Sequence, residues 1–243
     1  MAKLYVDTIE PEGGTTNLAI GESGQDVILP GNDIRANVLQ DAGGNAIFTS
    51  NGSGTLSGVS GGFGGPLALI SSQAVTNQAS ITFTSGITSA YDHYLFRFYM
   101  MNPATDNVTF YFYGSTNGGS SYGITKTTTF GPYANVDAAN TSNSNYGYHS
   151  GKDVRSGTGP HWLSYGLGNA TNECLSGELH IFDVASTSLV KNFYAVTGEW
   201  LYFNYADINY TAGYFDTTTA LNAFKFAMSS GNMDGTIKMY GVK

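Results

Sequence analysis

The sequence of 243 residues has few cysteines and few positively charged residues, and each scarcity excludes a class of protein. Cys174 is the single cysteine, so neither an intrachain disulfide framework nor a cysteine-based zinc site can form. The ten Lys and Arg residues are scattered from Lys3 to Lys243, whereas nucleic acids and anionic membranes require clustered positive charge. No apolar run approaches the length of a membrane span. We therefore expect no nucleic-acid binding and no membrane insertion.

Recognised catalytic patterns are also missing. The sequence contains no G-x-S-x-G, no H-E-x-x-H and no P-loop, so we expect neither an enzyme nor a cofactor. Glu178, His180 and Asp183 could offer two or three metal ligands on one strand, but no further ligand follows at a defined spacing, and we expect no metal. Glu173, Glu178 and Glu199 could in principle cleave a glycoside, and we interpret them as surface carboxylates.

Glycine and aromatic residues are abundant, and both are unevenly distributed. Residues 52–66 hold seven of the 32 glycines, and of the 33 aromatic residues only Tyr5, Phe48 and Phe63 precede residue 67. This change of composition predicts three parts. They are an oligomerising N-terminal β segment (1–51), a glycine-rich joint (52–66) and a C-terminal domain (67–243).

The N-terminal segment places small apolar clusters about every ten residues, with turn signals between them. This period favours short strands joined by tight turns, in an extended arm or stalk. The clusters are too sparse to form a core within one chain, so we expect partner chains to cover them. The candidate oligomerisation residues are Val6, Ile9, Leu18, Ile20, Val27, Leu29, Val38 and Phe48. A flexible glycine-rich arm with chance clustering is the alternative.

Beyond residue 66 the alternation of apolar and polar residues is typical of half-buried antiparallel strands. Abundant glycine, threonine, serine and asparagine also favour strands and turns over helices. We predict an all-β protein whose C-terminal domain is an antiparallel β-sandwich of jelly-roll type. The expected strands are 79–84, 91–101, 108–113, 124–130, 163–167, 177–184, 188–196, 200–205, 210–215, 223–228 and 235–242.

The longest irregular stretch of the second half, residues 131–160, is polar and is flanked by aromatic and imidazole rings. Flat rings with a polar tip stack on sugars or form compact protein contacts. The candidate receptor-binding residues are Tyr146, Tyr148, His149, His161 and Trp162. The alternative is that these rings fasten the loop or lie in a subunit interface. A second aromatic set favours core or inter-subunit packing, and it comprises Trp200, Tyr202, Phe203, Tyr205, Tyr210 and Tyr214.

Several short segments of the sequence resemble segments of tail-fibre and other virion appendage proteins of marine tailed bacteriophages. They are Leu4-Tyr-Val-Asp-Thr-Ile-Glu-Pro11, Asp41-Ala-Gly-Gly-Asn45, Phe48-Thr-Ser-Asn-Gly-Ser-Gly-Thr-Leu-Ser57, Pro103-Ala-Thr-Asp-Asn-Val108, Ser176-Gly-Glu-Leu-His-Ile-Phe182 and Met228-Ser-Ser-Gly-Asn-Met-Asp-Gly-Thr-Ile-Lys-Met-Tyr-Gly-Val-Lys243. The resemblance implies a β-rich homotrimer with a virion-proximal N-terminal segment that contacts other virion proteins. It also implies a C-terminal sandwich that faces the host. It supplies no catalytic residues.

These observations lead to the hypothesis of a virion structural protein, assembled in the host cytoplasm and exposed on the particle. A tail fibre or short appendage would contact a host surface glycan or protein through its C-terminal domain. Because the chain is short for a host-reaching fibre, a head fibre or a capsid decoration protein without a receptor role is an alternative. A secreted carbohydrate-binding module or glycan-degrading enzyme is the alternative from another class, and the missing secretory signal speaks against it.

Overall fold

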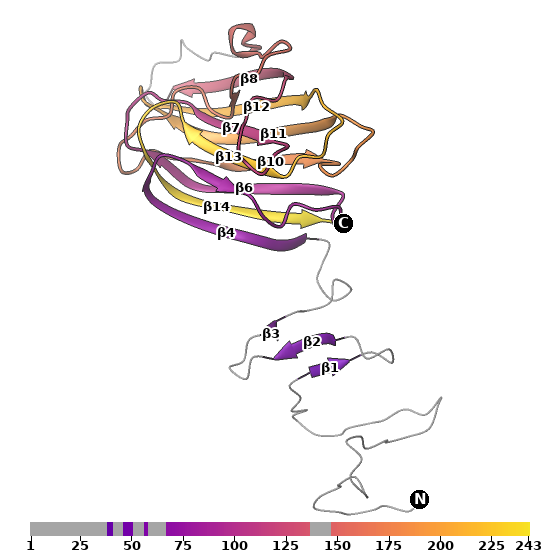
Figure 1. The fold of residues 1–243 in the computed structure, drawn as a ribbon. Helices are drawn as coiled ribbons and strands as arrows, with labels where there is room; N and C mark the ends of the chain where they lie inside the picture. The colour runs from indigo at the N-terminus through magenta and orange to yellow at the C-terminus, as the bar shows by residue number, and fades with distance from the viewer. Residues whose placement is uncertain (1–37, 41–45, 51–55, 58–66, 137–146) are drawn as a thin grey trace, which may run out of the picture. The chain divides into compact units, whose positions relative to one another are not determined.

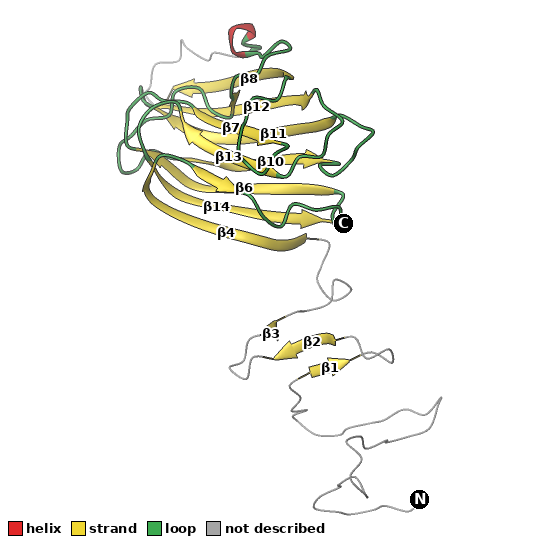
Figure 2. Cartoon of the chain, in the orientation of Figure 1, coloured by secondary structure: helices red, strands yellow, loops and turns green. Residues whose placement is uncertain are grey.

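The structure is a computed structural model of the chain, and it describes residues 38–40, 46–50, 56–57, 67–136 and 147–243. The chain divides into two compact units, Met1–Ser60 and Gly61–Lys243, each of which is treated by itself. The division falls within the predicted joint at 52–66. Figure 2 shows that the described residues are almost entirely strands and loops, with a single 3-10 turn, η2 (Ser150–Lys152). The prediction of an all-β protein is therefore confirmed for the described residues.

The first unit contains a small antiparallel sheet in the order β1-β2-β3. Its strands are β1 (Val38–Gln40), β2 (Ala46–Ser50) and β3 (Leu56–Ser57). Val38 pairs with Thr49 and its side chain is exposed, and Phe48 pairs with Leu39. The other candidate oligomerisation residues lie outside the described residues, namely Val6, Ile9, Leu18, Ile20, Val27 and Leu29. The predicted dependence of this segment on partner chains stays a prediction.

The second unit consists of two antiparallel sheets (Figure 1). The larger sheet has the order β4 (Leu67–Gln78), β14 (Met233–Val242), β6 (His93–Pro103), β10 (Leu175–Phe182), β11 (Lys191–Leu201), β12 (Tyr205–Phe215) and β8 (Lys126–Val136). The smaller sheet has the order β5 (Ile81–Phe83), β13 (Ala223–Met228), β7 (Phe110–Ser115) and β9 (His161–Trp162).

Phenylalanine rings from both sheets interlock between them and form the core. Phe226 of β13 lies 5.2 Å from Phe96 and 5.4 Å from Phe98 of β6, measured between ring centroids. Phe112 of β7 meets Phe193 of β11 edge to face at 4.9 Å. Edge-to-face contacts between buried rings add to the free energy gained from burying their area. The alternation seen in the sequence therefore reflects one buried face on each sheet.

Most predicted strands are confirmed, with β13 matching the range 223–228 residue for residue. Residues 104–109 connect β6 and β7, which lie in different sheets, so this connection is a corner between the sheets and not a hairpin. Two predicted strands are wrong. Residues 202–204 form a turn between β11 and β12, in which Asn204 has φ +63°. Residues 163–167 form no strand of their own and are irregular apart from an isolated bridge at Leu167.

Replacing Phe226 with Ala is expected to lower the free energy of unfolding by about 3–5 kcal/mol. The reason is that Phe226 is fully buried and touches rings from both sheets, so its loss leaves a cavity that neither sheet can close. Urea denaturation followed by circular dichroism measures the change. The control is Leu189→Ala, which truncates an exposed apolar side chain and is expected to stay within about 0.5 kcal/mol. Equal losses in both variants would contradict the assignment of the core.

Candidate functional site

Three neighbouring strands at one side of the larger sheet, β8, β11 and β12, bury their charged residues. The charged residues of these strands are Lys126, Lys191, Glu199 and Asp207, and all of them are buried. Buried charges are costly unless a partner of opposite charge or hydrogen bonds compensate them. The inner face of these strands therefore differs from an ordinary apolar core, because its buried charged residues need compensating partners.

The two acids form a pair. Glu199 of β11 lies directly opposite Asp207 of β12. Glu199 Oε1 accepts hydrogen bonds from the backbone N–H of Tyr165 and from Asn209 Nδ2, both at 2.8 Å. Within the described part of the chain, no donor lies in good hydrogen-bond geometry for Glu199 Oε2 or for either Asp207 carboxylate oxygen. The backbone amides of Tyr133 and Ile208 and the side chains of Glu199 and Asn209 nevertheless lie close enough to Asp207 to affect its pKa. The pair is thus only half satisfied by its surroundings.

Burial changes the protonation of this pair. It raises the pKa of Glu199 from 4.5 to about 8, and the hydrogen bonds from Tyr165 and Asn209 offset only part of that rise. Burial also raises the pKa of Asp207, against the opposing effect of the nearby backbone amides of Tyr133 and Ile208. At neutral pH the pair therefore favours retaining a proton.

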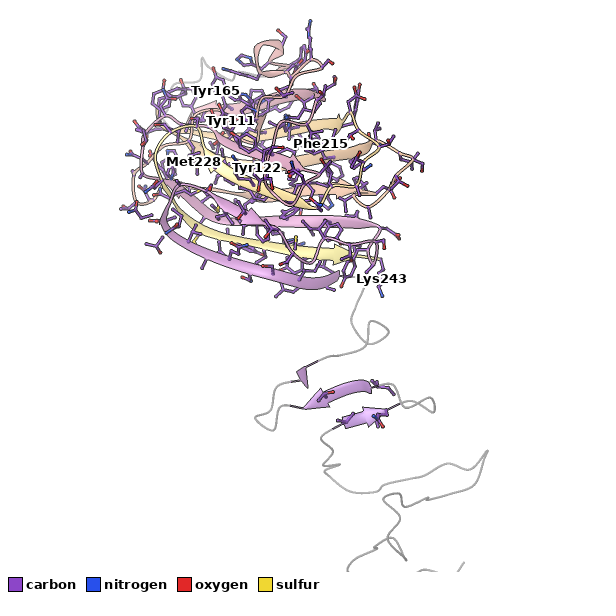
Figure 3. The ribbon with its side chains drawn as sticks, viewed as in Figure 1. Tyr111, Tyr122, Tyr165, Phe215, Met228 and Lys243 are labelled. Atoms are coloured by element: carbon purple, nitrogen blue, oxygen red, sulfur yellow. The ribbon has the colours of Figure 1, made fainter. Side chains whose placement is uncertain are left out.

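A cavity of about 300 Å³ lies beside the acid pair. Asp207 lines it, together with rings from β12, from the irregular segment 163–167 and from the chain before η2. Tyr165 belongs to the end of the unit where β8 and η2 lie (Figure 3). The full lining is Pro132, Ala134, Gly147, Tyr148, His149, Tyr165, Leu201, Phe203, Tyr205 and Asp207. Aromatic walls with a few polar groups are typical of small-ligand pockets.

Two candidate receptor-binding residues, Tyr148 and His149, line this cavity. Tyr148 is 63% exposed, and its hydroxyl donates a hydrogen bond to Asp153. The His149 ring lies 5.3 Å from the ring of Tyr165. Tyr146 lies outside the described residues. The structure therefore brings these two predicted residues together with Tyr165 and Asp207, which the sequence reasoning did not propose.

His161 does not belong to the surface, which corrects its proposed role in receptor contact. Its ring is fully buried against Phe112 and Phe193, and Nε2 shares a hydrogen bond with the hydroxyl of Thr211. Burial, together with the charge of Lys126, lowers the pKa of His161 to about 3. The residue is a neutral core histidine, because β9 turns it inward between the two sheets.

Trp162 is half buried, and its ring is covered by other side chains. The ammonium group of Lys152 in η2 lies 4.0 Å from its ring centroid, and the ring of Tyr111 packs edge-on at 5.6 Å. A cation over an indole ring is a favourable contact that holds both groups in place. This geometry supports the alternative stated for Trp162, in which the ring fastens the loop.

The outer face of β8, β11 and β12 carries tyrosines where a soluble surface usually carries charge. The exposed rings are Tyr133, Tyr194, Tyr210 and Tyr214. Two hollows of about 410 and 550 Å³ run along this face, and Tyr194 lines both of them. Since all charged residues of the three strands point inward, the surface that these strands expose is uncharged. Tyr210 and Tyr214 of the second aromatic set lie here and not in the core.

The remaining carboxylates considered for chemistry lie elsewhere. Glu178 forms an ion pair with Arg97 and contacts His180 on the outer face of the larger sheet. Glu173 is buried and accepts a hydrogen bond from the backbone of Ala170, so neither it nor Glu199 is the surface carboxylate that we expected. The described residues contain no group of three or more His, Cys, Asp or Glu side chains placed to hold a metal ion.

Comparison with protein-family models, curated proteins and solved structures finds no match to this chain. Among the described residues there is also no helix of the length and apolar character needed to cross a membrane. The candidate site is therefore described from the geometry of its own residues alone.

The raised pKa of Glu199 predicts a pH-dependent stability. The folded state holds the proton of Glu199 more tightly than the unfolded chain does, so protonation of Glu199 stabilises the folded state. This stabilisation is present in full below pH 4.5 and is lost as the pH rises to about 8. Glu199→Gln removes the titration. The unfolding free energy of the variant, relative to the native chain, is expected to rise by an amount on the order of 4 kcal/mol between pH 4.5 and pH 8.

Urea unfolding in EDTA-containing buffer across this pH range measures the difference. Glu178→Gln serves as the control, since that carboxylate is partly exposed beside Arg97. A difference between Glu199→Gln and the native chain that does not change with pH would refute the assignment.

Proposed function

We propose that the chain is a bacteriophage virion structural protein, a tail fibre or short appendage whose second unit contacts the host surface. The observation that carries the structural role is the inverted pattern of β8, β11 and β12, which bury their charges and expose tyrosines. Protein interfaces are depleted of charge at their centre and enriched in tyrosine, so this pattern is typical of a face that another protein covers.

The partner proposed for this tyrosine face is a second copy of the chain, within a homotrimer. Each copy carries a net charge of −8, so copies repel one another wherever charged surfaces meet. The outer face of these three strands is uncharged and supplies both ridges and hollows. It can therefore meet another copy without bringing like charges together.

We propose that the second unit is a jelly roll extended by three strands. Support comes from the two sheet orders β4-β14-β6-β10 and β5-β13-β7-β9. Along the chain, β4 to β7 alternate between the sheets, and the late strands β13 and β14 each insert between two early ones. This interleaving is expected of two Greek keys folded together. The additional strands β8, β11 and β12 widen only the larger sheet.

The first unit is proposed as the virion-proximal part of an arm or stalk, located on the particle and bound to other virion proteins. Its support is the exposure of Val38 and Leu39 on β1, which leaves apolar side chains for a partner to cover. The same feature fits the alternative of a head fibre or capsid decoration protein without a receptor role.

The proposed receptor site is the cavity lined by Tyr148, His149, Tyr165 and Asp207. Its volume of about 300 Å³ is suited to a single sugar residue and not to a flat protein epitope. Tyrosine rings supply stacking faces for a sugar, and the tyrosine hydroxyls and the His149 imidazole of the lining can exchange hydrogen bonds with its hydroxyl groups. The proposed ligand is therefore a host surface glycan.

The second candidate function, a carbohydrate-binding module outside a virion, draws on the same cavity. A glycan-degrading enzyme has less support. Of the acid pair, Asp207 lines the cavity and Glu199 does not, whereas hydrolysis of a glycoside needs two carboxyl groups flanking the bond. We propose binding without catalysis.

Native mass spectrometry of the full chain tests the assembly. The expected species has three times the chain mass of 25.8 kDa. Tyr194→Glu combined with Tyr210→Glu is expected to weaken association at least about tenfold, because carboxylates would be desolvated in the interface. Lys225→Glu on the smaller sheet is the control and is expected to leave association unchanged. A monomer at all concentrations would rule out the trimer.

A glycan array probed with the full chain tests the receptor site. We expect binding to at least one glycan, and Tyr148→Ala is expected to reduce it about tenfold or more because the sugar loses a stacking surface. Tyr122→Ala is the matched control, since that ring packs on Tyr113 away from the cavity lining. Absence of binding across the array, or full binding by Tyr148→Ala, would exclude this site.

A further inference from the structure

The outer face of the smaller sheet carries a cation and no acid. The outward side chains of β5, β13, β7 and β9 alternate with core residues, and they are Thr82, Lys225, Ala227, Tyr111, Tyr113 and Trp162. Among the residues of these four strands, Lys225 is the only lysine, arginine or acid. Since the chain as a whole has a net charge of −8, this face has the opposite sign to the rest of the molecule.

Aromatic rings hold two ammonium groups at this face. Lys225 Nζ lies 4.3 Å from the ring centroid of Tyr113 and 4.7 Å from that of Tyr122. Lys152 Nζ, which η2 supplies, lies 4.0 Å from the ring centroid of Trp162. A ring attracts a cation through its quadrupole and leaves the net charge of the cation unchanged. The rings therefore fix both ammonium groups in position without neutralising them.

Neither lysine has an acidic partner in the part of the chain that the structure describes. The ion pairs found there all involve Glu178, which lies on the outer face of the larger sheet. Asp153 follows Lys152 in the sequence, but its carboxylate accepts hydrogen bonds from the N–H of Phe130 and the hydroxyl of Tyr148. Both ammonium groups can therefore bind an anion from outside the chain.

The two ammonium groups lie at the ends of one row of side chains. Lys225 on β13 pairs with Tyr113 on β7. Trp162 on β9 pairs with Tyr111, which is two residues earlier on β7. With strands about 4.8 Å apart and a rise of about 3.3 Å per residue, the Cα atoms of Lys225 and Trp162 are about 12 Å apart. Figure 3 shows Tyr111 and Tyr122 on the side of the unit where β7 and β13 lie. A row of this length suits a ligand of several linked units.

We propose that this cation row, formed by Lys225, Tyr113, Tyr111, Trp162 and Lys152, binds an anionic glycan. The ammonium groups bind carboxylate or sulfate groups of the glycan, and the half-buried tyrosines between them offer apolar surface to its sugar rings. A nucleic acid carries a phosphate on every nucleotide, so the net charge of −8 opposes its binding more strongly than that of a glycan with sparser charge. The proposal rests on the proposed function in one respect, that the ligand is a glycan of the host surface.

Calorimetric titration of the full chain with oligogalacturonate tests the proposal, and the methyl ester of the same oligomer is the uncharged probe. The native chain is expected to bind the acid at least about tenfold more tightly than the ester, because the ester offers the ammonium groups no charge. Added salt is expected to weaken binding of the acid. Dextran sulfate is titrated separately, and its binding would support the proposal with sulfate groups as the source of the charge.

Substitutions in the row test the assignment of the two cations. Lys152→Gln combined with Lys225→Gln is expected to weaken binding of the acid about tenfold or more, because both charges are lost. Replacing both lysines with Arg keeps the charges and is expected to retain binding. The matched control is Lys238→Gln, which removes a lysine lying 5.1 Å from the ring centroid of Tyr99 on the larger sheet, and it is expected to bind as the native chain does. Circular dichroism shows whether each variant is folded.

Failure to bind either acidic polymer, equal binding of the acid and its methyl ester, or unchanged binding by the folded double glutamine variant would overturn the proposal. Tighter binding of single-stranded oligothymidine than of the glycans would also overturn it. The residues of the cation row do not line the cavity at Tyr148, so Tyr148→Ala is expected to leave binding of oligogalacturonate unchanged. Failure of the cavity as a receptor site and failure of the cation row are therefore separate results.

Discussion

The smaller sheet is narrower than the larger one, and this mismatch governs the rest of the second unit. Four strands face seven, and on the side of β8 and β12 the smaller sheet ends in the two-residue strand β9. The irregular residues 163–167 take over the covering role there. Irregular backbone brings unpaired N–H and C=O groups, which need polar partners when they are buried. Thr197 donates to the carbonyl of Leu163, and Glu199 accepts from the N–H of Tyr165.

The same mismatch accounts for the inverted strands. Polar side chains such as Thr197, Glu199 and Asp207 point inward, where they can bond to the irregular backbone. Because successive side chains of a strand point to opposite faces, the residues between them point outward. Those neighbours include Tyr194 and Tyr210, which are large and partly apolar. A constraint on the inside of the sandwich therefore produces both an incompletely satisfied acid pair and an uncharged outer face.

The sequence was informative where one face of a strand was clearly more apolar. Phe224, Phe226 and Met228 alternate with Lys225, and that range was predicted without error. The edge strand β4 was missed, because both of its faces mix apolar and polar residues: Leu67 and Leu69 are exposed, while Ile70 and Val75 pack only partly against the core.

On β11, Tyr194, Val196 and Trp200 make the outer face look at least as apolar as the inner one. The pattern alone therefore did not reveal that Glu199 points inward, or that Asp207 joins Tyr148 and His149 at one cavity. The inward alternation of Asp207, Asn209 and Thr211 is the signal that could have found the acid.

The first and last strands of the unit pair along one edge, with Leu67 opposite Val242, so the two ends of the sandwich leave it side by side. A module with adjacent ends can be spliced into a loop of an unrelated protein without stretching either junction.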